Sequence, residues 1–166
     1  MLDVFWQELT SGIQDSKQLT RVIIRLLAAT ILGGLVGVQR ESSRKPAGLR
    51  THMLVSLATA AFVISCSVSM SPDGLSRVIQ GIVTGIGFIG AGTILKLSVE
   101  HQIKGLTTAA SVWMTAAIGV TVGLGRLGIG LMVTALALFI LALEKLERRI
   151  ESKQAQSVMD KDVEGH

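Results

Sequence analysis

Five long apolar stretches dominate the sequence, and nearly all of its charged residues lie outside them. The stretches run over about residues 22–38, 53–70, 78–97, 106–124 and 127–143. A helix needs roughly 20 mostly apolar residues to cross a bilayer, and only helices or closed barrels satisfy their backbone groups in lipid. Barrel strands would instead be segments of about ten residues with alternating polarity. The sequence therefore predicts an all-α, polytopic membrane protein with five transmembrane helices in a compact bundle.

The charge content agrees with a membrane location. Only 17% of the 166 residues are Asp, Glu, Lys or Arg, against roughly 25% in a typical soluble domain. The net charge of +4 would suggest nucleic acid in a soluble protein, but here the basic residues flank the apolar stretches. We therefore expect no nucleic-acid partner. Cys66 is the single cysteine, which excludes a disulfide within one chain.

The basic residues also predict an orientation, because Lys and Arg in short loops mark the cytoplasmic side. The loop at 39–50, the loop around 96–104 and the C-terminal segment carry eleven of them, and the opposite side carries four. We expect the N-terminus outside and the C-terminus in the cytoplasm of a bacterial inner membrane. Residues 1–20 are predicted to form an outer-surface segment, 21–145 the membrane domain, and 146–166 a short, frayed cytoplasmic tail. The first twenty residues lack the pattern of a cleavable signal peptide.

Small residues recur at every fourth position, a spacing that lets helix backbones approach closely in lipid. The first stretch has such a row, the fourth has Gly119 and Gly123, and the third holds five glycines within twelve residues. Since each glycine weakens a helix by about 1 kcal/mol relative to alanine, a bent third helix that faces a cavity or partner is an alternative to simple packing. The residues predicted to pack helices are Ala29, Gly33, Gly37, Gly81, Gly85, Gly87, Gly90, Gly92 and Trp113.

Two polar stripes face the predicted cytoplasmic end: one is His52, Ser56 and Thr59, and the other is Thr107, Ser111 and Thr115. Their hydroxyls either bond within their own helices or line a polar cavity. A helix N-terminus favours an anion or carboxylate. Glu41 is accordingly predicted to cap the second or fourth helix, and the arginines to hold lipid phosphate or an acidic partner. A simpler interpretation pairs Glu41 with its neighbouring arginines. The candidate binding residues are Arg40, Glu41, Arg50, Thr51, His52, Thr107 and Thr108, with headgroup anchoring as their alternative role.

The sequence offers no pattern for catalysis or metal binding. No apolar stretch has a carboxylate near its centre, and no HExxH, CxxC, nucleophile-elbow or P-loop pattern occurs. Residues 85–90 match GxGxxG, but this pattern binds dinucleotides only between a strand and a helix. We therefore expect neither an enzyme nor a cofactor.

Four segments, at residues 25–41, 46–55, 85–92 and 105–113, together resemble the MgtC/SapB family of bacterial inner-membrane proteins. The resemblance covers about residues 20–145 and implies a five-span domain in the plasma membrane. It also implies a role in growth at low magnesium, acid tolerance or survival inside macrophages. Longer members of the family add a soluble cytoplasmic domain after the fifth span.

Two functions remain open at this stage. The resemblance implies a non-enzymatic regulator of other membrane proteins, among them the F-type ATP synthase. The polar stripes and the glycine-rich third stretch leave open a small ion or solute permease, linked to magnesium or protons. Membrane lipids and further copies of the chain are the other expected partners.

Overall fold

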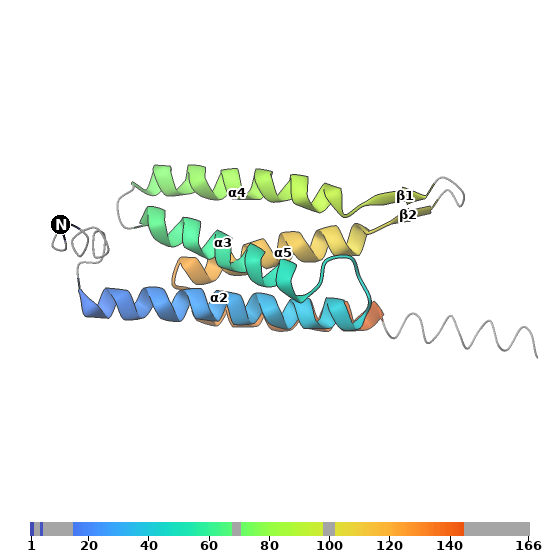
Figure 1. Cartoon of the computed structure of the whole chain (residues 1–166), viewed down its shortest axis with the longest axis horizontal. Helices are drawn as coiled ribbons and strands as arrows, with labels where there is room; N and C mark the ends of the chain where they lie inside the picture. Colours follow the sequence, from blue (N-terminus) through green and yellow to red (C-terminus); the bar gives the residue numbers. More distant parts are fainter. Residues whose placement is uncertain (2–3, 5–14, 68–70, 98–101, 145–166) are drawn as a thin grey trace, which may run out of the picture.

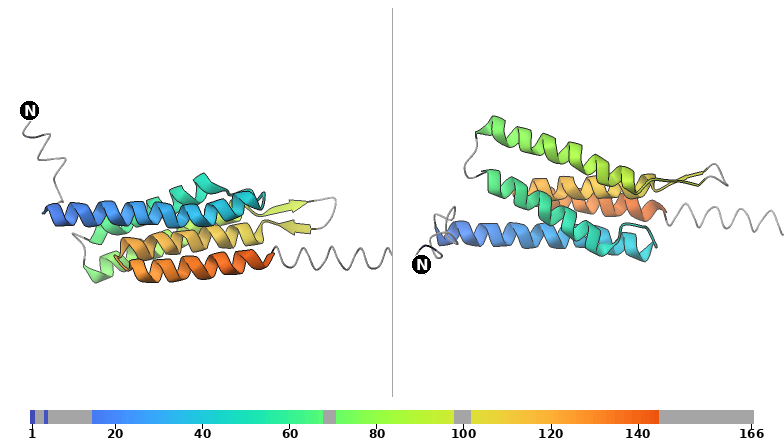
Figure 2. Two further views of the ribbon diagram at one scale, coloured as in Figure 1. Left: turned by 90° about the horizontal axis from the view of Figure 1, so that it is seen from below. Right: turned by 45° about the horizontal axis from the view of Figure 1, so that its top comes forward.

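A computed structural model describes residues 1, 4, 15–67, 71–97 and 102–144 of the chain. Five long helices and one short hairpin make up this part (Figure 1). Consecutive helices run in opposite directions, so each loop joins neighbouring helix ends (Figures 1 and 2). The elements are α2 (Ser16–Ser42), α3 (Leu49–Ser67), α4 (Pro72–Gly92), β1 (Leu95–Leu97), β2 (Gln102–Lys104), α5 (Leu106–Gly123) and a final helix (Leu127–Glu144).

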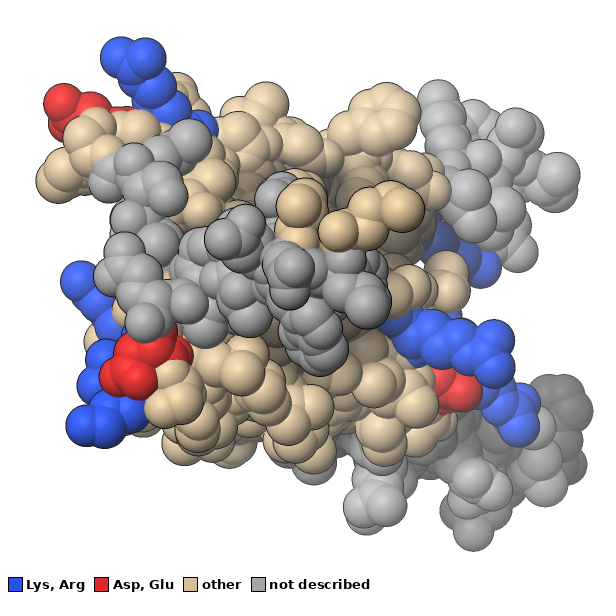
Figure 3. All heavy atoms as spheres, turned by 60° about the vertical axis from the view of Figure 1, so that its left-hand side comes forward, with Lys and Arg blue, Asp and Glu red and all other residues tan. Residues whose placement is uncertain are grey.

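All five helices are long and apolar enough to span a membrane, which confirms the predicted multi-pass bundle. The charged side chains of the described residues gather at the two ends, and uncharged side chains cover the band between them (Figure 3). One end holds the α2–α3 loop and the β1–β2 hairpin, and we call it the loop end. The other holds the start of α2 and the turn between α5 and the final helix, and we call it the turn end (Figure 1).

The core forms where α3 packs between α2 and α5. Its fully buried side chains include Val36, Ala60 and Val122, and the final helix adds Leu141 to the same cluster. Two glycines make this packing possible. A Cβ at Gly33 would lie 2.6 Å from the Ser56 Cβ. A Cβ at Gly119 would collide with α3 as well.

The remaining core glycines follow the same pattern. A Cβ at Gly37 would lie 2.6 Å from the Leu49 Cα, and one at Gly123 would lie 2.9 Å from the Ala60 carbonyl oxygen. Ala29 is fully buried beside them. The small residues of the first and fourth spans therefore lie where their helices approach α3 closely.

The glycines of α4 behave differently. A Cβ added at Gly90 would make an ordinary 3.6 Å contact with Ala109. Added at Gly81, Gly85, Gly87 or Gly92, it would meet nothing within 4 Å among the described residues. The prediction that these four glycines pack helices together is therefore wrong for contacts within the described part of one chain. The five glycines do not break the helix, since α4 is continuous from Pro72 to Gly92.

The third span begins and ends earlier than the sequence suggested, because α4 runs from Pro72 to Gly92 and residues 95–97 form β1. Thr93 closes the helix by donating its hydroxyl hydrogen to the Gly90 carbonyl at 2.7 Å. After the antiparallel hairpin, Gly105 has φ +103° and lies directly against the Thr93 backbone. A side chain at that position would be both strained and without space.

The other span limits differ by a few residues. The first helix begins at Ser16, inside the segment predicted to lie on the outer surface, and extends to Ser42. The fourth and fifth spans match their predicted ranges to within one residue. Of the predicted outer segment at 1–20, the structure describes residues 1, 4 and 15–20. The predicted tail at 146–166 lies outside the described residues.

Candidate functional site

Arg40 is the centre of a buried polar cluster at the loop end. Its side chain is fully buried, although it lies in the last turn of α2. One terminal nitrogen donates to the Glu144 carboxylate at 3.2 Å, and the other donates to the Thr108 hydroxyl at 3.2 Å. Lys45 pairs with the second oxygen of Glu144. Arg40 therefore joins α2 to α5 and to the end of the final helix.

A second set of hydrogen bonds continues from Arg40 into the bundle. His52 is fully buried, and its Nδ1 lies 2.8 Å from the Gly48 carbonyl, so Nδ1 carries a hydrogen and donates it. Its Nε2 lies 3.2 Å from the Ser111 hydroxyl, which donates to the Thr108 carbonyl at 2.8 Å. A hydroxyl has one hydrogen, so Ser111 can donate to Thr108 or to His52, but not to both at once.

Glu41 caps a helix, as one of its predicted roles required. Its Oε2 accepts a hydrogen bond from the Leu49 backbone amide at 2.8 Å, and Leu49 begins α3. The carboxylate thus satisfies one of the unpaired amides of the first turn and opposes the positive end of the helix dipole. The simpler interpretation, a pair between Glu41 and Arg40 or Arg44, is not seen among the described residues, where both salt bridges belong to Glu144.

The polar stripes end in an apolar core. The Thr59 hydroxyl donates to the Val55 carbonyl of its own helix, and the Thr115 hydroxyl to the Ser111 carbonyl. Beyond them the packing is apolar, with Ile118 and Val122 fully buried. The polar cluster is therefore confined to the loop end, and within the described residues no polar path continues from it to the turn end.

Three of its buried side-chain atoms lack a hydrogen-bond partner among the described residues: the Arg40 Nε, the Gln39 Oε1 and the Ser56 hydroxyl. Leaving such a group unpaired costs about 1–3 kcal/mol. These three atoms lie where α2 packs against the neighbouring helices. A cluster with spare donors and acceptors can take up a water molecule or another small polar group.

The structure divides the seven predicted binding residues. Arg40, His52 and Thr108 share the buried cluster, and Glu41 lies beside it as the cap. The other three lie outside its hydrogen bonds: Arg50 and Thr107 are exposed, and Thr51 is half-buried.

Four residues that connect helices through polar contacts were not among the predicted site residues, three of them beside the cluster and one at the turn end. The Gln39 amide donates to the Leu141 carbonyl at 3.0 Å, and Glu144 and Lys45 form the ion pairs. At the turn end, Arg25 donates to the Gly123 carbonyl at 3.1 Å and lies against Gly125, whose φ is +81°. For Arg25 the sequence did hold a signal, because a polar residue within an apolar stretch faces protein more often than lipid.

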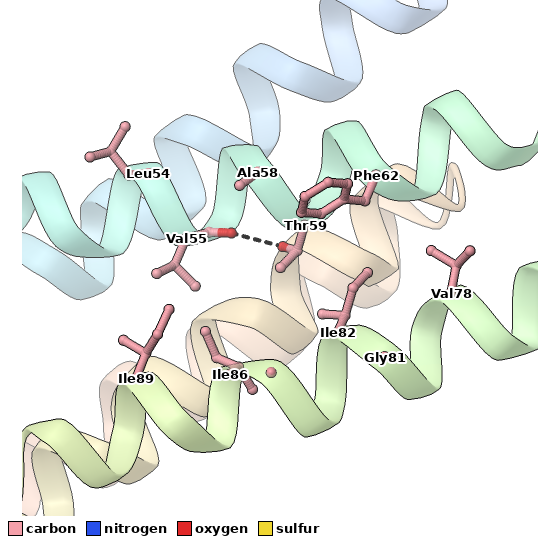
Figure 4. A pocket seen from close by; sticks show the side chains of 11 residues that line it. Leu54, Val55, Ala58, Thr59, Phe62, Val78, Gly81, Ile82, Ile86 and Ile89 are labelled. Atoms are coloured by element: carbon pink, nitrogen blue, oxygen red, sulfur yellow. Dashed lines mark hydrogen bonds between the residues drawn. The ribbon is translucent and has the colours of Figure 1, made fainter.

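An apolar groove separates α3 from α4 on the side of the bundle. Its volume is about 630 Å³, and Val55 and Ile86 point into the space between the helices (Figure 4). Gly81 and Gly85 form part of its α4 wall, and Phe62 stands at its edge with 57% of its surface exposed. Only 11% of the apolar segment of α4 is buried within the chain, against 50% for α5.

Trp113 belongs to α5 and lies on the side of α4 away from the groove. It is 46% exposed, and with Ile82 and Ile86 it lines a smaller hollow of about 170 Å³. It thus lies at the edge of the contact between α4 and α5.

Comparison with known proteins gives several bacterial relatives. Protein MgtC of Salmonella typhimurium is 44% identical over 116 residues, which cover 70% of this chain and 49% of that protein. Protein SrpB of Synechococcus elongatus is 39% identical over 138 residues, 76% of each chain. The protein of Escherichia coli K12 named "Putative magnesium transporter YhiD" is 44% identical over 128 residues, 72% of this chain and 58% of that one.

The chain spans about half the length of the MgtC proteins that it matches. No solved structure matches it. The sequence profile of the MgtC family matches residues 26–149, a range that contains the core glycines, the polar cluster and the α3–α4 groove. The chain therefore belongs to the MgtC family.

Proposed function

We propose that the chain is a non-enzymatic regulator in the bacterial inner membrane, which acts by binding helices of other membrane proteins. The observation that carries this proposal is the groove between α3 and α4, with Gly81 and Gly85 in its wall. Helices in lipid associate by close packing at small residues. A transmembrane helix of a partner would fit this groove, because a Cβ added at either glycine would meet nothing within 4 Å among the described residues.

The proposed setting is adaptation to low magnesium, acid or life inside a host cell, with the F-type ATP synthase among the partners. Both come from the family resemblance and not from the geometry. The site chemistry agrees with a regulator, because the hydrogen-bonded groups of the polar cluster hold helices together.

A growth assay tests this function. Gly85→Leu should abolish complementation at low magnesium, because leucine fills the groove where a partner helix would approach. Gly87→Leu is the matched control: it places the same side chain on α4, also in open space, but outside the groove. Equal complementation by both variants, at equal membrane abundance, would contradict the proposed role of the groove.

Topology is tested separately, since the proposal places the loop end in the cytoplasm. A reporter fused after Glu151 and active only in the periplasm should stay silent. The expectation rests on the excess of Lys and Arg at that end. A strong periplasmic signal would reverse the orientation.

A permease is the second candidate function, favoured by one observation: the polar cluster with its unpartnered Arg40 and Ser56 atoms. The name of the Escherichia coli relative points the same way. Purified protein in liposomes with a magnesium or proton reporter separates the two functions. We expect no flux above that of empty liposomes, because the cluster ends at a buried apolar core. Flux that Arg40→Lys abolishes would favour the permease.

A further inference from the structure

A second polar pocket lies at the turn end, far from the Arg40 cluster. Its volume is about 450 Å³, and it forms where the start of α2 meets the end of α3. Lys17, Arg21 and Arg25 all line it. Their spacing of four residues places them on one face of α2, so three positive charges are stacked along a single wall.

These charges are poorly neutralised by the residues that the structure describes. Asp15 is the one carboxylate in the lining, and it accepts a hydrogen bond from the Ser16 hydroxyl. In the part of the chain that the structure describes, both salt bridges belong to Glu144 at the other end. Arg25 is partly engaged, because it donates to the Gly123 carbonyl. Lys17 and Arg21 thus form no ion pair with a described residue, and the like charges of the stack repel one another.

We propose that this pocket binds the phosphate group of an anionic phospholipid. A phosphate offers several acceptor oxygens to Lys and Arg donors, and such charge-assisted bonds are the strong ones. An anion placed between Lys17 and Arg21 also relieves their mutual repulsion.

The remaining lining indicates a lipid rather than a free phosphate as the source. Val22 and Ile64 form the apolar part of the wall, and Ile23 beside them is 47% exposed. Basic groups at the helix end and apolar groups one turn further along match a headgroup followed by an acyl chain. Long basic side chains near helix ends reach the headgroup level of a bilayer.

The test uses the full chain purified in detergent. Phosphatidylglycerol, zwitterionic phosphatidylcholine and inorganic phosphate are added in separate titrations, and binding is measured by native mass spectrometry and thermal shift. Phosphatidylglycerol should bind more tightly than the other two. Arg21→Gln should weaken its binding about tenfold, from the loss of a charge-assisted hydrogen bond. Lys17→Gln should weaken it as well.

Arg77→Gln is the matched control, since Arg77 lies near the start of α4 at the same end but does not line the pocket. Arg77→Gln should leave the affinity unchanged. Equal losses from Arg21→Gln and Arg77→Gln, or equal binding of phosphatidylcholine, would overturn the site. If inorganic phosphate binds as tightly as phosphatidylglycerol and depends on Arg21, the phosphate site stands and the lipid source is wrong. Thermal unfolding without lipid checks that the variants fold, as expected for the exposed side chains of Lys17 and Arg21.

Discussion

The α2–α3–α5 core and α4 carry the same glycine spacing but use it in opposite ways. In the core, Gly33 and Gly119 bring two helices against α3, and a Cβ at either position would overlap its neighbour. On α4, Gly81 and Gly85 have the same four-residue separation and face open space among the described residues. The spacing therefore indicates a surface able to pack closely, but it does not indicate whether the contact lies inside the chain.

The largest effect should come from the core. In Gly119→Ala, the new methyl group would collide with the Thr59 hydroxyl and the Ser56 carbonyl. A backbone carbonyl cannot move aside as a side-chain end can, so we expect a loss of about 3 kcal/mol, measured by thermal unfolding in detergent. A stable Gly119→Ala variant would remove the distinction between the core and α4.

The next effect concerns how the loop end holds the core together. Arg40→Lys loses one of two hydrogen bonds, to Glu144 or to Thr108, because an ammonium group cannot reproduce the fork of a guanidinium. We expect a loss of roughly 2 kcal/mol, as for hydrogen bonds that involve charged groups. Arg50→Lys is the control and should be nearly silent, since Arg50 is exposed. Equal stability of both variants would mean that the cluster contributes little.

The smallest effect should come from α4. Gly85→Ala adds a methyl group where nothing lies within 4 Å, so it should stabilise the isolated chain by up to about 1 kcal/mol through helix propensity. Thermal unfolding of the purified monomer measures this. A clear loss of stability would show that α4 is packed within the chain after all.

The bundle could be predicted from the sequence because lipid imposes strong rules on length and composition. Five spans and the core rows at Gly33 and Gly119 follow from them directly. The end of α4 at Gly92 could not be predicted, because apolar residues that follow it, such as Ile94, would also suit a helix in lipid. The helix ends there because Thr93 caps it and the chain then enters the hairpin.

The candidate site was only partly predictable for a related reason. Arg40, His52 and Thr108 could be assigned to one membrane end from the order of the spans. The partner of Arg40 could not, because Glu144 lies 104 residues away and appears in the sequence as one more charge after the last span. Which loop-end arginine turns inward also depends on rotation of the helix, and the sequence does not specify that rotation. Arg50 was therefore predicted on the same terms as Arg40.

The long-range hydrogen bonds between α2 and later helices have a consequence for biogenesis. Arg25, Gln39 and Arg40 find their partners 98, 102 and 104 residues later. At a synthesis rate of roughly 5–20 residues per second, the ribosome takes about 5–20 s to deliver those partners. During that interval the partners of all three side chains are still to be made: that of Arg25 belongs to α5, and those of Gln39 and Arg40 belong to the final helix. Among the five described spans, α2 is thus the earliest in the chain, yet it completes its contacts only when the final helix has been made.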